Sequence, residues 1–263
     1  MKAGPATAMK LIVTRPAAQA TAWVQDLQAL GLDAQALPLI DIAAAADLAP
    51  IQAAWQQLPG FALVMFVSAN AVAHFFALAP HSAGWPVGVM AASTGPGTTA
   101  ALHAAGVPPA AVVQPSPGST RFDSEALWAQ LSRQDWAGRS VLVVRGEEGR
   151  DWLADTLQGR GAQVQFVAAY QRHAPRPGAA GLALLAQALQ APRAHLWLFS
   201  SNQALGHLRG LAPAADWSRS RALASHPRIV QSARALGFGQ VLECPPSPSA
   251  VAARWPSIQS LAS

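Results

Sequence analysis

The sequence predicts an α/β protein built from two similar domains, each with a doubly wound sheet of mainly parallel strands. The first observation is the stretch Ser140–His173, in which a β-branched run, an amphipathic helix and a second extended run follow one another. This order is typical of a strand–helix–strand unit. The second observation is that Leu11–Asp41 shows the same order. The third is a nearly constant spacing between matching positions of the two halves.

That spacing indicates an internal duplication of roughly half the chain. The matching pairs, with their separations in residues, are Arg15 and Arg145 (130), Gly31 and Gly161 (130), Phe66–Asn70 and Leu198–Asn202 (132), and Gly106 and Gly237 (131). A drift of only two residues across separate elements is typical of a repeat, so two similar α/β domains are expected.

The elements of the first half have local causes. Lys10–Thr14 is an apolar strand, and Pro16 starts a helix because its missing N–H is not needed there. Gly31 ends that helix, and residues 34–42 are extended, with Pro38 favouring a strand edge or a connector. Further strands are expected at 61–67, 87–92 and 112–113, and further helices at 43–58, from 68 onward, from 98 to 106, and at 124–131.

The second half repeats the alternation. A strand at 141–144 leads into a helix through Leu153 and Leu157, with Glu147 and Glu148 in its first turn. We expect them to complement the helix dipole, with a catalytic carboxylate there as the alternative. Strands are then expected at 163–170, 196–199, 222–225 and 241–242, and helices at 182–189, before 237, and from 249.

Composition excludes several classes of protein. The chain has 263 residues, of which 51% are hydrophobic and 12% charged, and its net charge is +5. The positive charge is almost all arginine and forms no basic run, so we expect no nucleic-acid partner. Arginine instead suits a small polyanionic ligand, because its planar fork fits a carboxylate.

The cellular setting follows from cysteine content and hydropathy. Cys244 is the single cysteine, which excludes an internal disulfide and favours a reducing compartment. No apolar run reaches about 18 residues without a polar interruption, and the N-terminus lacks the apolar segment of a signal peptide. We therefore expect a cytoplasmic protein with no membrane partner.

The residues that could carry chemistry share one geometry. Each is expected at the carboxyl end of a strand, the edge where open parallel sheets bind ligands and where the following helix directs free N–H groups. They are Arg15, Ser68, Thr98, Arg145, Ser200 and His226, together with Asn70, Ser201, Asn202 and Arg228 in the same turns. The serines, the asparagines and His226 are equally good helix caps, so capping and ligand contact both remain open for them.

Other chemistries find little support. Residues 95–100 fit the dinucleotide pattern G-x-G-x-x-A, but they open the third strand–helix step, and no acidic residue follows at the end of the next strand. The histidines lack metal-ligand spacing, and no G-x-S-x-G elbow is present. We therefore expect neither a metal nor a cofactor.

An ordered set of motifs resembles the uroporphyrinogen-III synthase family. The motifs are Val13–Pro16, Leu37–Ile40, Phe66–Val72, Gly95–Thr98, Ser124-Glu125, Arg145-Gly146, Ala169–Arg172, Leu198–Ser201, His226–Ile229 and Gly237-Phe238. They run in family order from about residue 10 to 255. Each is weak alone, and their order gives the set its specificity.

The resemblance implies a particular arrangement of the repeats. It implies two flavodoxin-like domains with parallel sheets, one made of residues 1–34 and 174–263 and the other of residues 45–163. Residues 35–44 and 164–173 would form a two-stranded connector, and the active site would lie in the cleft between the domains. A two-stranded hinge would let that cleft open and close.

The resemblance also implies a reaction. Family members close linear hydroxymethylbilane into uroporphyrinogen III, with loss of water and inversion of ring D, as a step of tetrapyrrole and heme biosynthesis. Tyr170, the only tyrosine, matches the tyrosine of the family motif and becomes the candidate catalytic residue that assists the departing hydroxyl. A phenol is protonated at neutral pH, as this role requires. A purely packing role for Tyr170 remains the alternative.

The resemblance further implies a monomer that uses no cofactor and takes its substrate from hydroxymethylbilane synthase upstream. A second function class also fits the duplicated lobes: a non-catalytic two-lobed binding module for a small polycarboxylate. The absence of a signal sequence favours the enzyme over an exported sensor.

Overall fold

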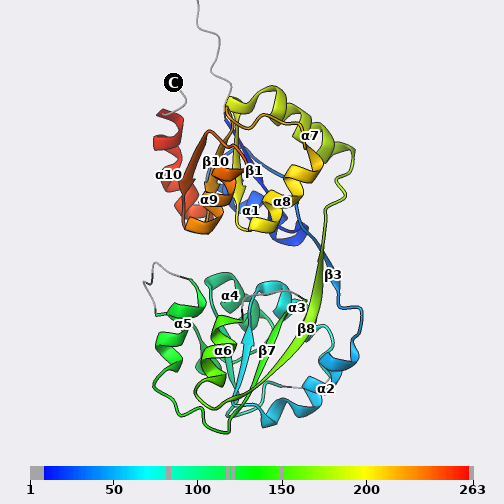
Figure 1. The fold of residues 1–263 in the computed structure, drawn as a ribbon, viewed down its shortest axis with the longest axis vertical. Helices are drawn as coiled ribbons and strands as arrows, with labels where there is room; N and C mark the ends of the chain where they lie inside the picture. The colour runs from blue at the N-terminus through cyan, green and yellow to red at the C-terminus, as the bar shows by residue number, and fades with distance from the viewer. Residues whose placement is uncertain (1–8, 81–83, 117–118, 120–121, 148–150, 261–263) are drawn as a thin grey trace, which may run out of the picture. The chain divides into compact units, whose positions relative to one another are not determined.

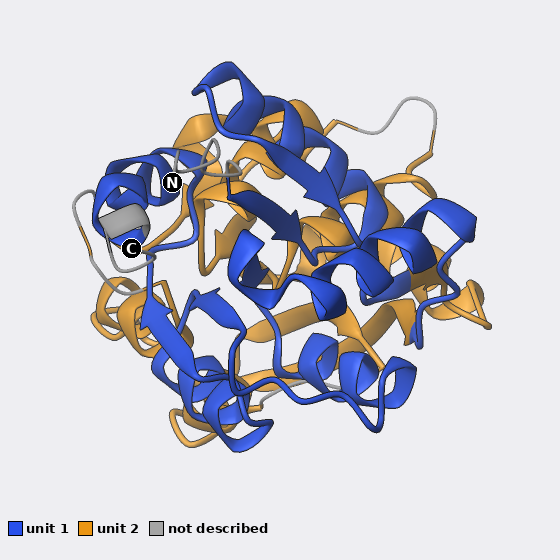
Figure 2. Ribbon diagram, turned by 90° about the horizontal axis from the view of Figure 1, so that it is seen from above, with its two compact units in different colours: residues 1–41, 173–263 blue, residues 42–172 orange. Residues whose placement is uncertain are grey.

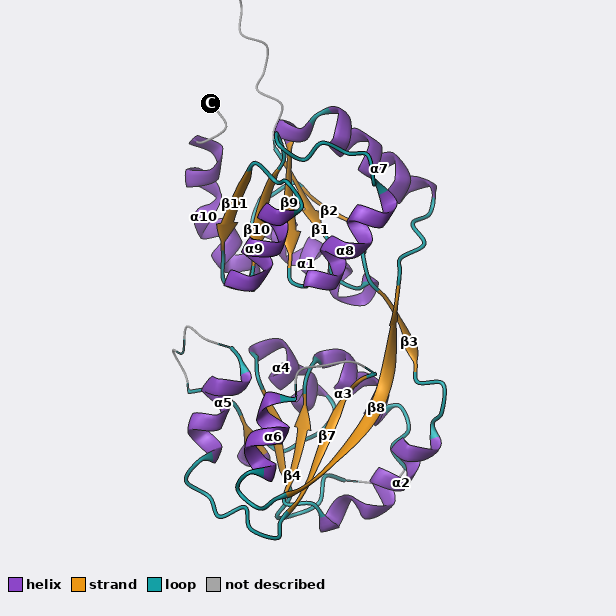
Figure 3. Ribbon diagram, viewed as in Figure 1, coloured by secondary structure: helices purple, strands orange, loops and turns teal. Residues whose placement is uncertain are grey.

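The computed structural model describes residues 9–80, 84–116, 119, 122–147 and 151–260, and the chain forms two compact units (Figures 1 and 2). Unit 1 contains residues 1–41 and 173–263, and unit 2 contains residues 42–172. Each unit has its own β-sheet of mainly parallel strands with helices on both faces (Figure 3). The α/β class with two parallel sheets, expected from the sequence, is confirmed.

Unit 1 contains a five-stranded sheet in the order β11-β10-β9-β1-β2. Its strands are β1 (Lys10–Val13), β2 (Ala34–Ala36), β9 (His195–Phe199), β10 (Arg221–Ala224) and β11 (Gln240–Glu243). All neighbours pair in parallel, so their carboxyl ends share one edge. The helices are α1 (Ala17–Ala29), α7 (Ala179–Gln190), α8 (Asn202–Leu211), α9 (Pro227–Ala235) and α10 (Pro248–Ser260).

The two faces of the unit 1 sheet bury different side chains. Aliphatic residues cover the face under α1 and α10, where Leu11, Leu196 and Leu223 join Leu27 and Val251. The opposite face is aromatic: the Trp197 and Phe199 rings stack 6.0 Å apart, and those of Trp217 and Phe238 stack at 5.1 Å. Alternation along each strand produces the two cores, because successive side chains point to opposite faces.

Unit 2 contains a six-stranded sheet in the order β3-β8-β7-β4-β5-β6. Its strands are β3 (Asp41–Ala44), β4 (Leu63–Phe66), β5 (Met90–Ser93), β6 (Val112–Val113), β7 (Ser140–Gly146) and β8 (Gln163–His173). Its helices are α2 (Ala49–Gln57), α3 (Ala69–Phe76), α4 (Pro96–Ala104), α5 (Ser124–Leu131) and α6 (Trp152–Gln158). The chain passes from one unit to the other within β3 and at the end of β8.

Both faces of the unit 2 sheet are also covered. Phe66, Val64 and Leu142 pack with Phe75 of α3 and Leu102 of α4 on one face. On the other face, Met65 and Val143 pack against residues of α5 and α6. Strands β4 and β7 are therefore buried on both sides, which explains why they are continuous apolar runs.

The internal duplication is visible in the strand register. Leu11 pairs with Ala34 in unit 1, and Val141 pairs with Val164 in unit 2, so both partners shift by 130 residues. The 132-residue match of Phe66–Asn70 with Leu198–Asn202 is wrong by one residue. Ser68 and Ser201 are the residues that cap α3 and α8, so the spacing there is 133. Phe199 is followed by two serines, so the sequence alone allows either Ser200 or Ser201 to match Ser68. The cap geometry identifies Ser201 as the match.

Two expected helices begin later than the sequence suggests. Residues 43–58 do not form one helix, because β3 extends to Ala44 and α2 begins at Ala49. Helix α6 begins at Trp152, after Asp151. Glu147 is therefore exposed outside the helix and cannot complement its dipole, and Glu148 lies outside the described residues. Acidic residues complement a helix dipole only where a helix begins, and α6 begins further along the chain than Glu147.

A matched pair of glycines ends the first helix of each repeat. Gly31 has φ +80° and Gly161 has φ +86°, a region that side chains rarely adopt. A Cβ added at Gly161 would lie 3.2 Å from the Ala137 Cα, whereas one at Gly31 would have no neighbour within 4 Å.

We predict that Gly161→Ala lowers the free energy of unfolding more than Gly31→Ala does. Gly31→Ala is expected to cost about 1–2 kcal/mol, the ordinary penalty of this backbone region. Gly161→Ala should exceed that value because the backbone of Ala137 cannot yield cheaply. Urea titrations of both variants measure the difference, and equal losses would contradict the steric argument.

Candidate active site

Tyr170 lies on β8 where the strand pairing is irregular. Arg145 pairs with Ala168, but Gly146 pairs with Tyr170, so β8 carries one extra residue at this point. The Tyr170 side chain is fully buried, with a relative exposure of 0%. A Cβ at Gly146 would lie 3.1 Å from the Tyr170 ring, so a side chain there would press on the ring and force it to shift. Such bulges re-aim side chains and are common next to active sites.

The Tyr170 hydroxyl joins two polar side chains of unit 2. Arg172 Nη2 donates a hydrogen bond to it at 2.8 Å, and Ser68 Oγ lies 3.1 Å away. Ser68 Oγ also accepts a hydrogen bond from the Ala71 N–H at 3.2 Å, which caps α3. The His74 ring stacks on the Tyr170 ring with centroids 6.0 Å apart. Of the predicted site residues, Ser68 and Tyr170 are thus brought into direct contact.

Arg145 does not occupy the expected position. It lies inside β7 rather than after it, because that strand continues through Gly146. Its guanidinium forms an ion pair with Asp151 and lies over the Phe166 ring, 4.3 Å from the centroid. The extension of β7 was not predicted because the turn signal Arg145-Gly146 resembles a strand end. Arg145 is therefore already engaged by protein groups.

The turn before α4 also differs in detail from expectation. Gly95 is the N-cap, and Thr98 lies inside the helix with 8% exposure, not at the end of the strand. The neighbouring Thr99 hydroxyl bonds Ser93 Oγ at 2.6 Å and Gln114 Oε1 at 2.8 Å. These bonds tie the ends of β5 and β6 together. Asn70 is the second residue of α3, beside Ser68.

In unit 1, Arg15 is the second residue after β1, which ends at Val13, and it is largely buried. Its Nη1 donates to Gln19 Oε1 at 3.2 Å, and its guanidinium lies 4.2 Å from the Trp23 ring centroid. Its Nε is buried without a hydrogen-bond partner. Burial lowers the pKa of Arg15 to about 10, so the group still carries its charge at neutral pH. Within the described residues, no carboxylate pairs with it.

Two more turns of unit 1 lie at the same edge of the sheet. Ser201 accepts a hydrogen bond from the Gln203 N–H at 3.2 Å and caps α8, with Asn202 as the first helical residue. Ser200 precedes this cap, at the end of β9. His226 Nδ1 accepts from the Arg228 N–H at 3.2 Å and caps α9. For Ser201 and His226 the capping role is therefore directly visible.

The electrostatics of this edge suit an anion. Strands β1, β9 and β10 are adjacent, so the turns after Val13, Phe199 and Ala224 lie at one edge. The turn residues 14–16, 200–202 and 225–228 include two arginines and one histidine and no acidic residue. The N-termini of α1, α8 and α9 follow these turns, and their N–H groups and dipoles favour negative charge.

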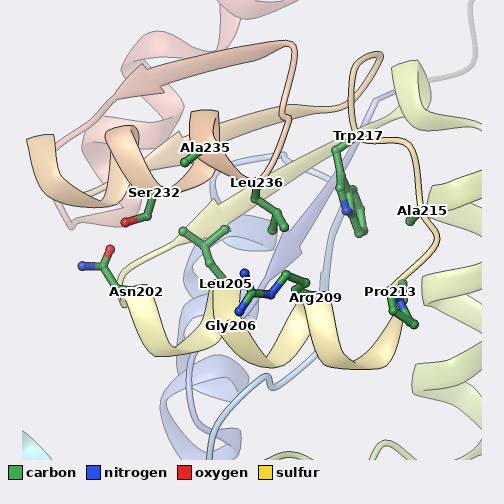
Figure 4. Close-up of a pocket in the computed structure, with 11 residues that line it drawn as sticks. Asn202, Leu205, Gly206, Arg209, Pro213, Ala215, Trp217, Ser232, Ala235 and Leu236 are labelled. Atoms are coloured by element: carbon green, nitrogen blue, oxygen red, sulfur yellow. The ribbon is translucent and has the colours of Figure 1, made fainter.

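A surface pocket of about 480 Å³ lies on unit 1 between α8 and α9. Figure 4 shows its lining: Leu205 and Leu236 face one another, Trp217 lies toward the loop after α8, and Arg209 is the charged residue. Of the predicted site residues, Asn202 contributes to it. The pocket therefore extends along α8 from the turn after β9.

Among the residues that the structure describes, no group of three His, Cys, Asp or Glu side chains could hold a metal ion. In the same part of the chain, no helix has the length and apolar character needed to span a bilayer.

Arg172 is a site residue that the sequence argument did not select. The sequence does carry a signal for it, since residues two apart on a strand share a face and Arg172 follows Tyr170 by two. Asp151 was missed for another reason: its role as partner of Arg145 depends on the turn between β7 and α6. Both contacts depend on side-chain direction, which a motif does not encode.

Comparison with known proteins points to one family. A family model described as uroporphyrinogen-III synthase HemD matches residues 21–252. Uroporphyrinogen-III synthase of Escherichia coli K12 is 30% identical over 240 residues, covering 89% of this chain and 94% of that protein. The Salmonella typhimurium protein of the same name is 36% identical over 165 residues, and the match spans 62% of this chain and 65% of that protein.

Solved structures show the same fold. A mutant uroporphyrinogen III synthase from the extremely thermophilic bacterium Thermus thermophilus superposes with a TM-score of 0.59 at 18% identity, covering 96% of this chain and 100% of that one. The Helicobacter pylori 26695 uroporphyrinogen-III synthetase gives a TM-score of 0.53 at 13% identity, covering 96% and 99%.

We predict that Arg15→Met increases thermal stability. The charged guanidinium is buried with one nitrogen unpartnered, and removing it relieves desolvation while methionine keeps the packing against Trp23. The expected gain is about 1 kcal/mol. Because burial lowers the Arg15 pKa, this charge destabilises the fold at every pH below about 10.

Thermal unfolding at pH 7 measures the effect. Arg160→Met is the matched control, because Arg160 is exposed and lies over the Trp128 ring at 5.5 Å. The control should change stability by no more than about 0.5 kcal/mol. A loss of stability in Arg15→Met larger than in the control would show that the Arg15 contacts outweigh its desolvation.

Proposed function

Because this chain belongs to the uroporphyrinogen-III synthase family, we propose that it closes hydroxymethylbilane into uroporphyrinogen III, with loss of water and inversion of ring D. The observation that carries the proposal is the family match over residues 21–252. The proposal is also supported by the turns that follow the strands of both sheets, because their polar side chains and helix N-termini suit carboxylates. The reaction is a step of tetrapyrrole biosynthesis and makes the protein a hydro-lyase.

The chemistry of the substrate agrees with the site. Hydroxymethylbilane carries eight carboxylates, and several helix N-termini can bind such a ligand with few charged side chains. We propose that the carboxylates contact residues of both units. These residues are Arg15, Ser200, Ser201, Asn202, His226 and Arg228 in unit 1, and Ser68, Asn70, Thr98 and Arg145 in unit 2. For Arg145, binding would require exchange of Asp151 for the ligand.

We propose that correct positioning of the two ends of the substrate supplies much of the acceleration of ring closure. Hydroxymethylbilane cyclises by itself to the wrong isomer, so the enzyme must mainly hold its ends in the arrangement that inverts ring D. Holding two reacting groups together can lower a barrier by about 7–11 kcal/mol. Many weak contacts spread over a long substrate suit this task, because each restricts one part of the chain.

Departure of the hydroxyl needs a hydrogen-bond or proton donor, and we assign Tyr170 to that step. The structure limits how it can act. Its side chain has 0% exposure, and its hydroxyl contacts Arg172 and Ser68. We propose further that residues 35–44 and 164–173 form the connector, that the protein acts as a monomer, and that hydroxymethylbilane synthase supplies its substrate.

The deciding experiment is incubation of the protein with enzymatically made hydroxymethylbilane, followed by separation of the product isomers. We expect the type III isomer to dominate, against a control without protein that gives type I. Binding of hydroxymethylbilane with no change in the isomer ratio would instead identify a two-lobed binding module.

We also predict that KM for hydroxymethylbilane rises several-fold between about 0.05 and 0.5 M NaCl, while kcat changes little. Contacts between carboxylates and exposed cationic turns weaken as the Debye length shortens. Steady-state kinetics across this range test the prediction. A KM independent of salt would argue against carboxylate binding by these turns.

A further inference from the structure

We propose that Ser68 is the group that meets the substrate oxygen, and that Arg172 and Tyr170 act through it as positioning residues. This inference rests on the proposed function and assigns roles within its unit 2 site. It changes the role of Tyr170 from direct donor to the middle member of a hydrogen-bonded chain, and the role of Ser68 from a carboxylate contact to the donor that meets the departing hydroxyl. The chain runs from Arg172 through Tyr170 to Ser68.

Which atom donates in each hydrogen bond between Arg172, Tyr170 and Ser68 follows from the donors that each side chain carries. A guanidinium only donates, so the Tyr170 oxygen accepts from Arg172 Nη2 at 2.8 Å. The Tyr170 proton then needs an acceptor, and within the described part of the chain Ser68 Oγ is the one in reach, at 3.1 Å. If Ser68 donated instead, the buried Tyr170 proton would have no partner, at a cost of about 1–3 kcal/mol. Tyr170 therefore donates to Ser68.

Counting donors and acceptors in the same way shows that the hydroxyl hydrogen of Ser68 is available for a hydrogen bond to the substrate. Ser68 Oγ accepts from the Tyr170 hydroxyl and from the Ala71 N–H at 3.2 Å, so both of its acceptor sites are used. Among the residues that the structure describes, no further group accepts the hydroxyl hydrogen of Ser68, so this hydrogen is available to the substrate. Ser68 is half-buried at the carboxyl end of β4, whereas Tyr170 is fully buried. Ser68 can therefore reach a substrate oxygen that Tyr170 cannot.

Arg172 supplies the charge. This residue is exposed, and its guanidinium donates to the Tyr170 oxygen and lies 5.5 Å from the ring centroid. A hydrogen bond from a charged donor is about twice as strong as a neutral one and polarises the next bond in the chain. The Ser68 hydroxyl thus becomes a better donor to the departing hydroxyl than a serine that only caps a helix.

The duplicated unit provides an internal comparison. Ser201 caps α8 as Ser68 caps α3, by accepting from the Gln203 N–H at 3.2 Å. The position matching Tyr170, 130 residues earlier, is Ile40, which has no hydroxyl. Capping therefore does not require a tyrosine behind the serine. The fold does not need the Tyr170–Arg172 extension, and its presence in one unit alone indicates a function.

Kinetics test the shared pathway. We expect Ser68→Ala to lower kcat for uroporphyrinogen III at least tenfold, and Tyr170→Phe and Arg172→Gln to lower it several-fold, with KM little changed. The double variant Ser68→Ala/Tyr170→Phe should be no slower than Ser68→Ala, because Tyr170 acts through Ser68. Arg172→Lys should recover part of the rate. Multiplicative losses in the double variant, or wild-type turnover in Ser68→Ala, would overturn the proposal.

Loss of the cap needs a matched control, since Ser68→Ala also removes a hydrogen bond to α3. Asp123→Ala removes the cap of α5, where Asp123 Oδ1 accepts from the Ala126 N–H at 2.9 Å. It should lower stability by a similar amount, about 0.5–2 kcal/mol, and leave kcat unchanged. An equal loss of kcat in Asp123→Ala would attribute the Ser68 effect to capping and overturn the proposal.

A spectroscopic readout separates this inference from the proposed function. Tyr170 is the only tyrosine, so tyrosine labelled with ¹³C at Cζ gives one resonance that reports the hydrogen bonds of its oxygen. We expect Arg172→Gln and Ser68→Ala each to shift that resonance, and Arg160→Gln to leave it in place. An unshifted resonance in Arg172→Gln would disprove the hydrogen bonds from Arg172 through Tyr170 to Ser68, even if the enzyme is active. If the wild type is inactive but the variants show the expected shifts, only the proposed activity is disproved.

Discussion

Parallel pairing of strands is the constraint on which the rest of this structure depends. It places the carboxyl ends of β1, β9 and β10 at one edge in unit 1, and those of β4, β5 and β7 at one edge in unit 2. Each of these strands leads toward a helix, so unsatisfied N–H groups gather at the same edge. Anion binding is then a property of the backbone, which explains how a chain with 12% charged residues can suit a polycarboxylate.

Within that scaffold, burial of a polar group decides the fine structure of the site. Tyr170 is fully buried among apolar side chains of unit 2, and an unpaired phenol there would be costly. The bulge in β8 and the absence of a side chain at Gly146 give the ring its space. Arg172 and Ser68 then satisfy the hydroxyl, so the packing requirement itself builds a polar connection toward the sheet edge.

The duplication shows how one scaffold supports different electrostatics. Arg15 and Arg145 occupy matching positions 130 residues apart. Arg145 is neutralised by Asp151, whereas Arg15 is buried against Trp23 and its pKa falls to about 10. A buried cation without a carboxylate costs stability but is ready for an anionic ligand. The two units therefore share their backbone and differ in which charges remain available.

The sequence by itself determined the α/β class, the repeat and the family, because hydrophobic period and ordered motifs are local properties that survive divergence. It also identified Ser68 and Tyr170, although from separate motifs 102 residues apart. Only the tertiary structure decided that these two touch, that Arg145 is paired, that Thr98 is buried and that Ser201, not Ser200, matches Ser68. Such facts depend on strand register, on the bulge in β8 and on where each helix begins. These features arise from packing between distant segments, which no single stretch of sequence contains.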